Sequence, residues 1–326
     1  MELVLVPLST AAAVVPILTF LLVLWWMDRY DREPFGLFAV VFVWGAGGAV
    51  VFAMASTAAA VLPLEHAIGA QAAAWTASVL VAPLVEEPIK AAILLLLPFS
   101  RHFDNATDGF VYGGAAGLGF GMTENLLYFT GVAMSGDPAG WMGTVVIRTF
   151  YSALMHASAT GLVGAAIGFT LFRPLRTRVL ATVAGLLIAM TMHGIWNGLL
   201  TADEAMGAEG ALFGMDLLVF PFEVLAVVAL FQFCLWDERR ILLDELGEEA
   251  TLGVLPPAHV PVLASWLRRS GRAWLAPGVP HAAYVRAATT LAFRKRQARL
   301  ARADASRLDD VSRLRAEIGR MLTSSG

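Results

Sequence analysis

The sequence predicts an all-α fold: a polytopic bundle of about seven transmembrane helices, with the N-terminus outside, the C-terminus inside and a helical cytoplasmic tail. Apolar residues make up 58% of the 326 residues and charged residues only 15%, whereas soluble domains average about 45–50% and about 25%. Seven apolar runs are separated by loops that alternate in basic charge. The single cysteine, Cys234, excludes an intrachain disulfide framework and any cysteine-rich metal site.

The apolar runs define the expected helices and the domain boundary. A helix needs about 20 predominantly apolar residues to cross the hydrocarbon core of a bilayer. The runs that meet this requirement are roughly 5–27, 36–62, 72–98, 109–133, 141–172, 178–200 and 213–236. The first run is too long and too weakly basic at its start for a cleavable signal peptide. We therefore expect a membrane bundle over residues 1–236 and a basic, partly helical tail over residues 237–326.

Loop charges predict the orientation, because cytoplasmic loops carry an excess of lysine and arginine. Basic residues follow the first, third and fifth runs, at Arg29 and Arg32, Arg101, and Arg173, Arg176 and Arg178. The alternate loops contain neither lysine nor arginine. This alternation indicates a multi-pass protein of the cell membrane whose tail lies in the cytoplasm.

The tail from Asp237 contains 15 of the 23 basic residues and ten acidic ones. Tyr284–Arg302 has the composition of a basic helix, and Val311–Met321 that of an amphipathic helix. Such helices bind membrane surfaces or partners, but a solvated tail that only fixes the topology has the same composition. The net charge of −3 predicts no nucleic-acid partner, so the expected partners are the lipid bilayer and a membrane protein.

Ionisable residues lie inside the apolar runs, where each costs roughly 2.5–3.5 kcal/mol to insert and therefore faces the bundle interior. The helical rise places the acids and imidazoles of four runs near the midplane. The charged residues and histidines in the interior of the runs are Glu86, Glu87 and Lys90 in the third run, Glu124 in the fourth, Arg148 and His156 in the fifth, His193 in the sixth, and Asp216 and Glu223 in the seventh. The seventh run is not one of the four at the midplane.

The spacing within the third run brings opposite charges together. Lys90 is three residues from Glu87 and four from Glu86, so its ammonium can reach either carboxylate. Two adjacent carboxylates in a medium of low dielectric cannot both ionise cheaply unless a cation such as Lys90 or Arg148 lies nearby. A buried ion-pair network that only locks the bundle together would show the same spacing, and so this pattern leaves a structural role open.

The available side chains restrict the chemistry. No GxSxG or HExxH motif occurs, and a two-aspartate protease would need a second intramembrane aspartate beside Asp216. The remaining candidate groups are carboxylates, two imidazoles and the amide of Asn197, which follows His193 by four residues. They suit a glutamate that activates water while His, Asn or a metal ion stabilises the oxyanion.

Four blocks of sequence, in order, resemble the PrsW-type intramembrane proteases, whose wider clan includes the CAAX prenyl endopeptidases. The blocks are Glu86-Glu87-Pro88-Ile89-Lys90; Asp108 to Gly113 continuing to Glu124-Asn125; Arg148 with His156; and His193 with Trp196-Asn197. The resemblance covers about residues 20–236. It implies cleavage of a single-span membrane protein similar to an anti-sigma factor, as the first cut of a regulated cascade.

The resemblance also implies roles for the residues. Glu86 and Glu87 become the catalytic carboxylates and Asn197 an oxyanion donor. The rest of the catalytic centre comprises Lys90, Glu124, Arg148, His156 and His193. Glu124, His156 and His193 can supply three N/O ligands to a divalent metal ion, with zinc the expected one. The same groups can also hydrolyse a peptide without metal; we favour the metal.

Two other classes of function fit the same intramembrane charges. Chains of glutamate, lysine and histidine also build proton relays in proton- or cation-coupled transporters, although the repeats and paired broken helices typical of transporters are not apparent. A non-catalytic scaffold with a partner-recruiting tail would use the charges as structural ion pairs. Apolar replacement of the carboxylates together with Lys90 would then be tolerated.

Overall fold

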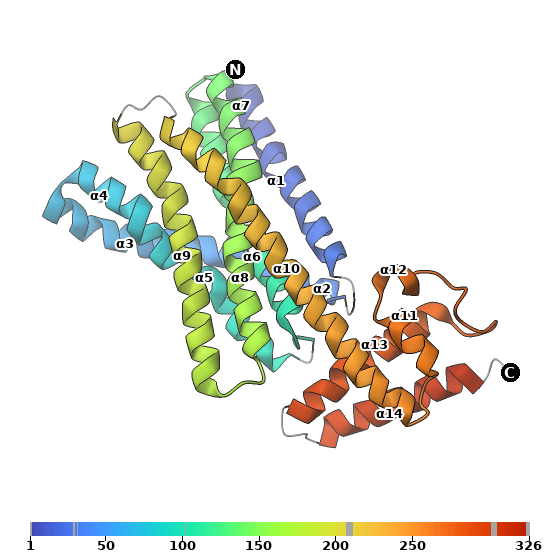
Figure 1. The fold of residues 1–326 in the computed structure, drawn as a ribbon. Coiled ribbons are helices and arrows are strands. Elements are labelled where there is room, and N and C mark those ends of the chain that lie inside the picture. The colour runs from blue at the N-terminus through green and yellow to red at the C-terminus, as the bar shows by residue number, and fades with distance from the viewer. Residues whose placement is uncertain are drawn as a thin grey trace. The chain divides into compact units, whose positions relative to one another are not determined.

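The computed structural model describes residues 2–28, 30, 32–100, 102–206, 211–300 and 305–323, and the described residues form helices without a β-strand (Figure 1). The predicted all-α fold is confirmed. Arg29 and Arg101, which contributed to the predicted orientation, lie outside the described residues, and so does the side chain of Asp216.

The described residues between 2 and 251 form seven continuous helical segments, one for each apolar run. Short π-helical stretches, Trp44–Ala49, Ala77–Val81 and Arg148–Ser152, interrupt three of them. The α-helices are α1 (Glu2–Met27), α2 (Phe35–Val43), α3 (Val50–Ile68), α4 (Ala70–Thr76), α5 (Ala82–Ala92), α6 (Ala106–Met134), α7 (Pro138–Ile147), α8 (Ala153–Thr170), α9 (Leu175–Met206) and α10 (Ala211–Thr251). The later helices are α11 (Val260–Leu263), α12 (Trp266–Arg269), α13 (His281–Leu300) and α14 (Ala305–Thr323).

Five of the described helical segments are long and apolar enough to cross a membrane: Val4–Met27, Phe35–Ile68, Pro138–Thr170, Leu175–Ala202 and Phe220–Thr251. The segment containing α5 and the glycine-rich α6 are not among them. Glu86, Glu87 and Lys90 lower the hydropathy of the α5 segment. Seven spans with an external N-terminus therefore stay a prediction.

The chain divides into two compact units. The first comprises Met1–Met27 and Glu33–Leu230, and the second comprises Asp28–Arg32 and Phe231–Gly326. The boundary lies within α10, so this helix contributes to both units.

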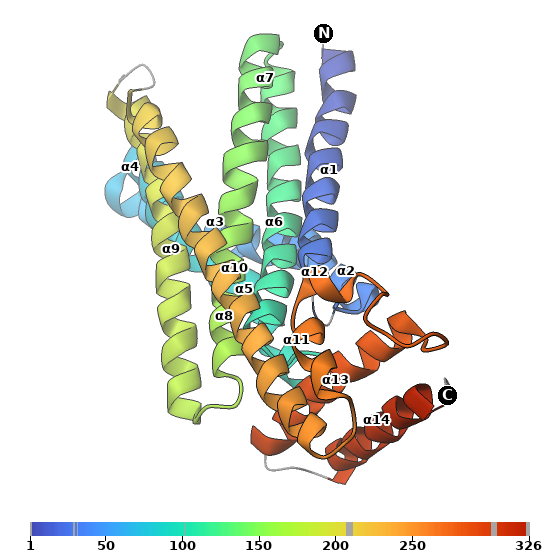
Figure 2. The same ribbon diagram turned by 45° about the vertical axis from the view of Figure 1, so that its right-hand side comes forward.

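Helices α6 and α8 are the centre of the first unit and lie side by side (Figure 1, Figure 2). Gly109, Gly113 and Gly117 of α6 allow the two backbones to touch, as small residues do between membrane helices. A Cβ atom built on Gly117 would lie 2.2 Å from the carbonyl oxygen of His156. Close backbone packing therefore fixes the position of His156.

Replacing Gly117 by alanine is expected to push α8 away from α6 at His156. Overpacking of this kind costs about 1–3 kcal/mol, so we expect a lower unfolding midpoint in detergent together with slower substrate cleavage. Gly131→Ala in the same helix is the matched control, because a Cβ atom there meets nothing within 4 Å. Equal stability and activity of the two variants would contradict this packing argument.

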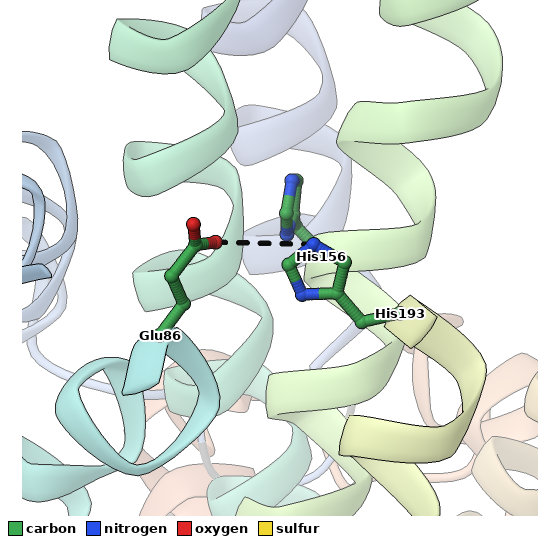
Figure 3. Close-up of side chains that lie close together, drawn as sticks. All are labelled: Glu86, His156 and His193. Atoms are coloured by element: carbon green, nitrogen blue, oxygen red, sulfur yellow. Dashed lines mark ion pairs between the residues drawn. The ribbon is translucent and has the colours of Figure 1, made fainter. Parts of the chain in front are cut away.

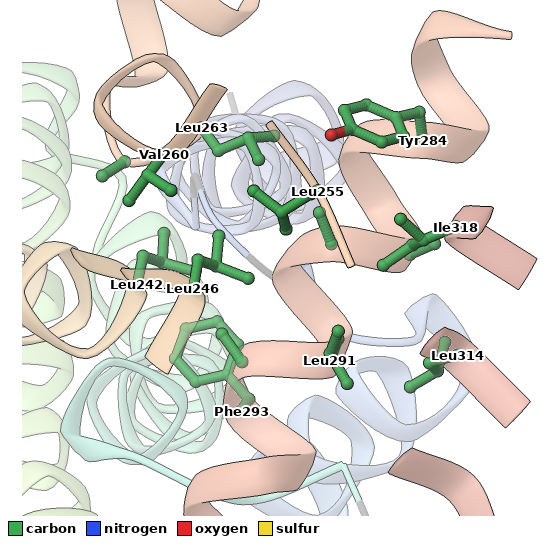
Figure 4. Close-up of a cluster of buried hydrophobic side chains, with 14 of the residues drawn as sticks. Leu242, Leu246, Leu255, Val260, Leu263, Tyr284, Leu291, Phe293, Leu314 and Ile318 are labelled. Atoms are coloured by element: carbon green, nitrogen blue, oxygen red, sulfur yellow. The ribbon is translucent and has the colours of Figure 1, made fainter. Parts of the chain in front are cut away.

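The second unit has its own apolar core, formed by the C-terminal part of α10 with α11, α13 and α14 (Figure 4). Leu242 and Leu246 of α10 contribute to the core with Ile318 of α14. The hydroxyl of Tyr284 lies 2.8 Å from Nδ1 of His259. Burial raises the pKa of Tyr284 and lowers the pKa of His259, so at neutral pH a neutral phenol and a neutral imidazole share this hydrogen bond.

Candidate active site

Four helical segments bring seven of the eight predicted site residues into one connected cluster. Helix α5 carries the two adjacent glutamates and the lysine, α6 carries the third glutamate, and the segment containing α8 carries the arginine and the first histidine. The second histidine is on α9. The cluster consists of Glu86, Glu87, Lys90, Glu124, Arg148, His156 and His193.

Glu87 and Lys90 form a fully buried ion pair within the cluster, with 0% side-chain exposure for both. Lys90 Nζ lies 2.5 Å from Glu87 Oε1, and His193 Nδ1 lies 2.7 Å from the same oxygen. Because a carboxylate only accepts, His193 donates from Nδ1, and in its neutral form it keeps a lone pair on Nε2. Glu87 thereby fixes both the tautomer and the orientation of His193.

His156 connects the lysine to the third glutamate. Lys90 Nζ lies 2.9 Å from His156 Nδ1, and His156 Nε2 lies 2.8 Å from Glu124 Oε2. An ammonium group only donates, so Nδ1 accepts and the neutral ring donates through Nε2 to Glu124. The rings of His156 and His193 meet edge to face, with centroids 4.9 Å apart.

Arg148 contacts the same oxygen of Glu124 as His156 does. Its Nη2 lies 2.8 Å from Glu124 Oε2, and its Nε donates to Asn125 Oδ1 at 3.2 Å. The guanidinium also stacks over the Tyr128 ring, 3.7 Å from the ring centre. Asn125 and Tyr128 therefore position Arg148, a role that spacing along the sequence did not reveal because their partner comes from another helix.

Glu86 has a free oxygen beside His193. Its side chain is 14% exposed, and its buried Oε2 has no hydrogen-bond partner among the described residues. This oxygen lies 3.9 Å from His193 Nε2 (Figure 3), too far for a hydrogen bond. A metal ion could bridge the two atoms, because the distance between them is just below the length of two metal–ligand bonds of about 2.0–2.2 Å placed end to end.

Glu86, His156 and His193 can each offer one ligand atom, and these atoms lie within 4.8 Å of one another. Two histidine nitrogens and one carboxylate oxygen form a typical zinc donor set. The predicted set contained Glu124 in place of Glu86, but Glu124 Oε2 already accepts from His156 and forms an ion pair with Arg148. The residues present fit a metal ion, provided that His156 gives up one of its present hydrogen bonds.

The charge balance of the cluster also favours a cation. Three carboxylates converge on only two permanent cations, Lys90 and Arg148. If all three carboxylates are ionised and both imidazoles are neutral, the site carries a net negative charge, and Glu86 is the carboxylate without a permanent cation bonded to it. A bound divalent cation would compensate this buried charge.

Asn197 is the predicted site residue whose hydrogen bond points out of the cluster. Its Nδ2 donates to the carbonyl oxygen of Ser78 at 2.9 Å, in the π-helical stretch before α5. The Ser78 hydroxyl also lies 3.3 Å from that of Thr201. These bonds tie α9 to the start of the α5 segment, and the oxyanion role of Asn197 stays a prediction.

Comparison with known proteins finds one family and curated relatives within it. The sequence model described as "PrsW family intramembrane metalloprotease" matches residues 33–231. Protease PrsW of Bacillus subtilis (strain 168) is 29% identical over 197 residues, 59% of this chain and 82% of the relative. Protease PrsW of Geobacillus kaustophilus (strain HTA426) is 27% identical over 208 residues, 64% and 86% of the respective chains. No solved structure matches.

Proposed function

The chain belongs to the PrsW family of intramembrane metalloproteases, and we propose that Glu86, His156 and His193 form its hydrolytic centre. A membrane-embedded peptidase follows from the family. The observation that supports this centre is the partnerless Oε2 of Glu86, which faces a histidine nitrogen with a free lone pair. A buried acceptor and a buried lone pair so close together suit the capture of a water molecule or a cation.

Glu86 acts as the general base in this proposal. Of the two adjacent glutamates it is the one with partial exposure, whereas Glu87 is fully buried and bonded to Lys90 and His193. Through the carboxylate oxygen that does not bind the metal, Glu86 accepts a proton from the attacking water and returns it to the leaving amine when the peptide bond breaks. Asn197 is the proposed donor to the oxyanion, which requires its amide to leave Ser78.

Glu86, His156 and His193 would hold a divalent metal ion, with zinc as the proposed metal. When bound, such an ion supplies a Lewis acid that acidifies water and polarises the scissile carbonyl. Glu87 then serves as the carboxylate that orients a ligating histidine, an arrangement common in zinc sites. Arg148 keeps Glu124 ionised and directed at His156.

The proposed substrate is a single-span membrane protein similar to an anti-sigma factor, cleaved in the cell membrane. The acids and imidazoles lie deep in apolar helical segments. A peptide bond that reaches them must itself lie in the membrane or unwind into it, which favours a transmembrane substrate over a soluble one.

Cleavage in proteoliposomes that contain a single-span substrate tests the proposal. We expect 1,10-phenanthroline to abolish cleavage and added zinc to restore it, while the non-chelating 1,7-isomer has no effect. Full cleavage by protein verified to be metal-free would contradict the metal. Cation-coupled uptake in the same vesicles without any cleavage would favour the transporter instead.

A further inference from the structure

The second unit contains a long stretch free of acidic residues. Residues 250–303 include nine basic residues and no aspartate or glutamate, although acidic residues flank the stretch on both sides. Blocks of one charge sign commonly bind a surface of the opposite sign. The nine are Arg268, Arg269, Arg272, Arg286, Arg294, Lys295, Arg296, Arg299 and Arg302.

Several of these cations already have partners inside the unit. Lys295 lies 2.9 Å from Glu249, Arg299 lies 2.6 Å from Glu248, and Arg294 donates to Gln297. In contrast, Arg268 and Arg272 are exposed, and no described carboxylate lies within ion-pair distance of either. Their charge is available for an external partner.

An exposed leucine lies next to these two arginines. Leu267 is 77% exposed, and together with Arg268 and Arg272 it belongs to residues 265–272, which we call the Leu–Arg segment. The segment is anchored at its end, because Trp274 donates to the carbonyl oxygen of Gly271 at 2.7 Å. An exposed apolar side chain followed by arginines is typical of sequences that lie in the interface of a bilayer.

The chain itself keeps this segment close to the membrane. Tyr30 follows Met27, the last residue of a candidate membrane span, by only three residues. Its hydroxyl donates to the carbonyl oxygen of Ala264 at 3.3 Å, and the Arg269 guanidinium lies 4.7 Å from its ring centre. Three residues reach at most about 11 Å, so the start of the Leu–Arg segment is tethered at the end of that span.

We propose that the Leu–Arg segment binds the anionic lipid surface of the membrane in which the protein is embedded. Leu267 inserts at the level of the headgroups, and Arg268 and Arg272 pair with lipid phosphates. The exposed leucine and the short tether favour lipid over an acidic protein or a nucleic acid as the partner.

A fluorophore at position 267 of the full chain tests this contact. Cys234 is the only cysteine and is buried, so Leu267→Cys in a Cys234→Ala background gives a single labelling site. In nanodiscs of phosphatidylcholine and phosphatidylglycerol we expect blue-shifted emission and strong quenching by lipid-borne nitroxide. A label at Ser312→Cys, an exposed position of α14, is the matched control and should stay accessible to aqueous iodide.

Removing the charges should release the segment. Each arginine near an anionic surface contributes about fivefold to binding, so Arg268→Gln/Arg272→Gln is expected to lower the docked-to-undocked ratio about 25-fold. Discs of phosphatidylcholine alone should have a similar effect. Equal lipid quenching at positions 267 and 312 would overturn the proposal, and so would docking that is unchanged by both the double variant and neutral lipid.

Discussion

Replacing Glu86 by glutamine is expected to lower kcat/KM for substrate cleavage by at least about 10³-fold, the upper range for removal of a general base. The amide keeps the size of the side chain but cannot take a proton from water. Because Oε2 of Glu86 has no hydrogen-bond partner to lose, the variant should unfold at the wild-type temperature. Initial rates in proteoliposomes, measured beside thermal unfolding in detergent, give both quantities.

Glu223→Gln is the matched control for this variant. Glu223 is also a glutamate within an apolar helical segment and is half-buried, but it lies on α10 outside the cluster. We expect the Glu223→Gln variant to cleave substrate at close to the wild-type rate. If Glu86→Gln retains wild-type activity, or if Glu223→Gln loses as much, the assignment of Glu86 as the base is wrong.

Replacing Lys90 by methionine is expected to destabilise the protein by about 3–5 kcal/mol, the typical effect of removing one partner of a buried ion pair. The change leaves Glu87 with no cation in direct contact and His156 without the donor to its Nδ1. Unfolding in mild detergent with increasing denaturant should show the loss.

A double variant separates the structural role of this ion pair from its role in catalysis. In Glu87→Gln/Lys90→Met both charges are gone, so stability should return close to that of the wild type. Cleavage should remain impaired by about 10–100-fold, because the carboxylate that orients His193 has been removed. Full activity in this double variant would show that the ion pair has only a structural role in the enzyme.

The helices were predictable because each apolar run is long, and a chain in a membrane satisfies its backbone hydrogen bonds within a helix. The π-helical stretches were not predictable, since no residue pattern distinguishes Arg148–Ser152 from an ordinary helical turn. The number of spans also stays open, because the charges of the α5 segment remove it from the segments that hydropathy identifies.

Within the site, spacing along one helix predicted that Lys90 reaches Glu86 or Glu87, and the structure pairs it with Glu87. Contacts between helices could not be deduced in the same way. The choice between Glu86 and Glu124 beside the imidazoles depends on Arg148, which reaches across from another helix and occupies Glu124. Likewise, nothing in the sequence indicated that the Ser78 carbonyl accepts from Asn197.

The metal content of the purified protein tests most directly whether the acids and imidazoles form one centre. By elemental analysis we expect about one zinc per wild-type chain, as in a mononuclear catalytic site, and an undiminished value for Glu223→Gln. His193→Ala should lose the metal and cleavage together while it remains folded. Full metal content and full cleavage in His193→Ala would contradict a centre built on Glu86, His156 and His193.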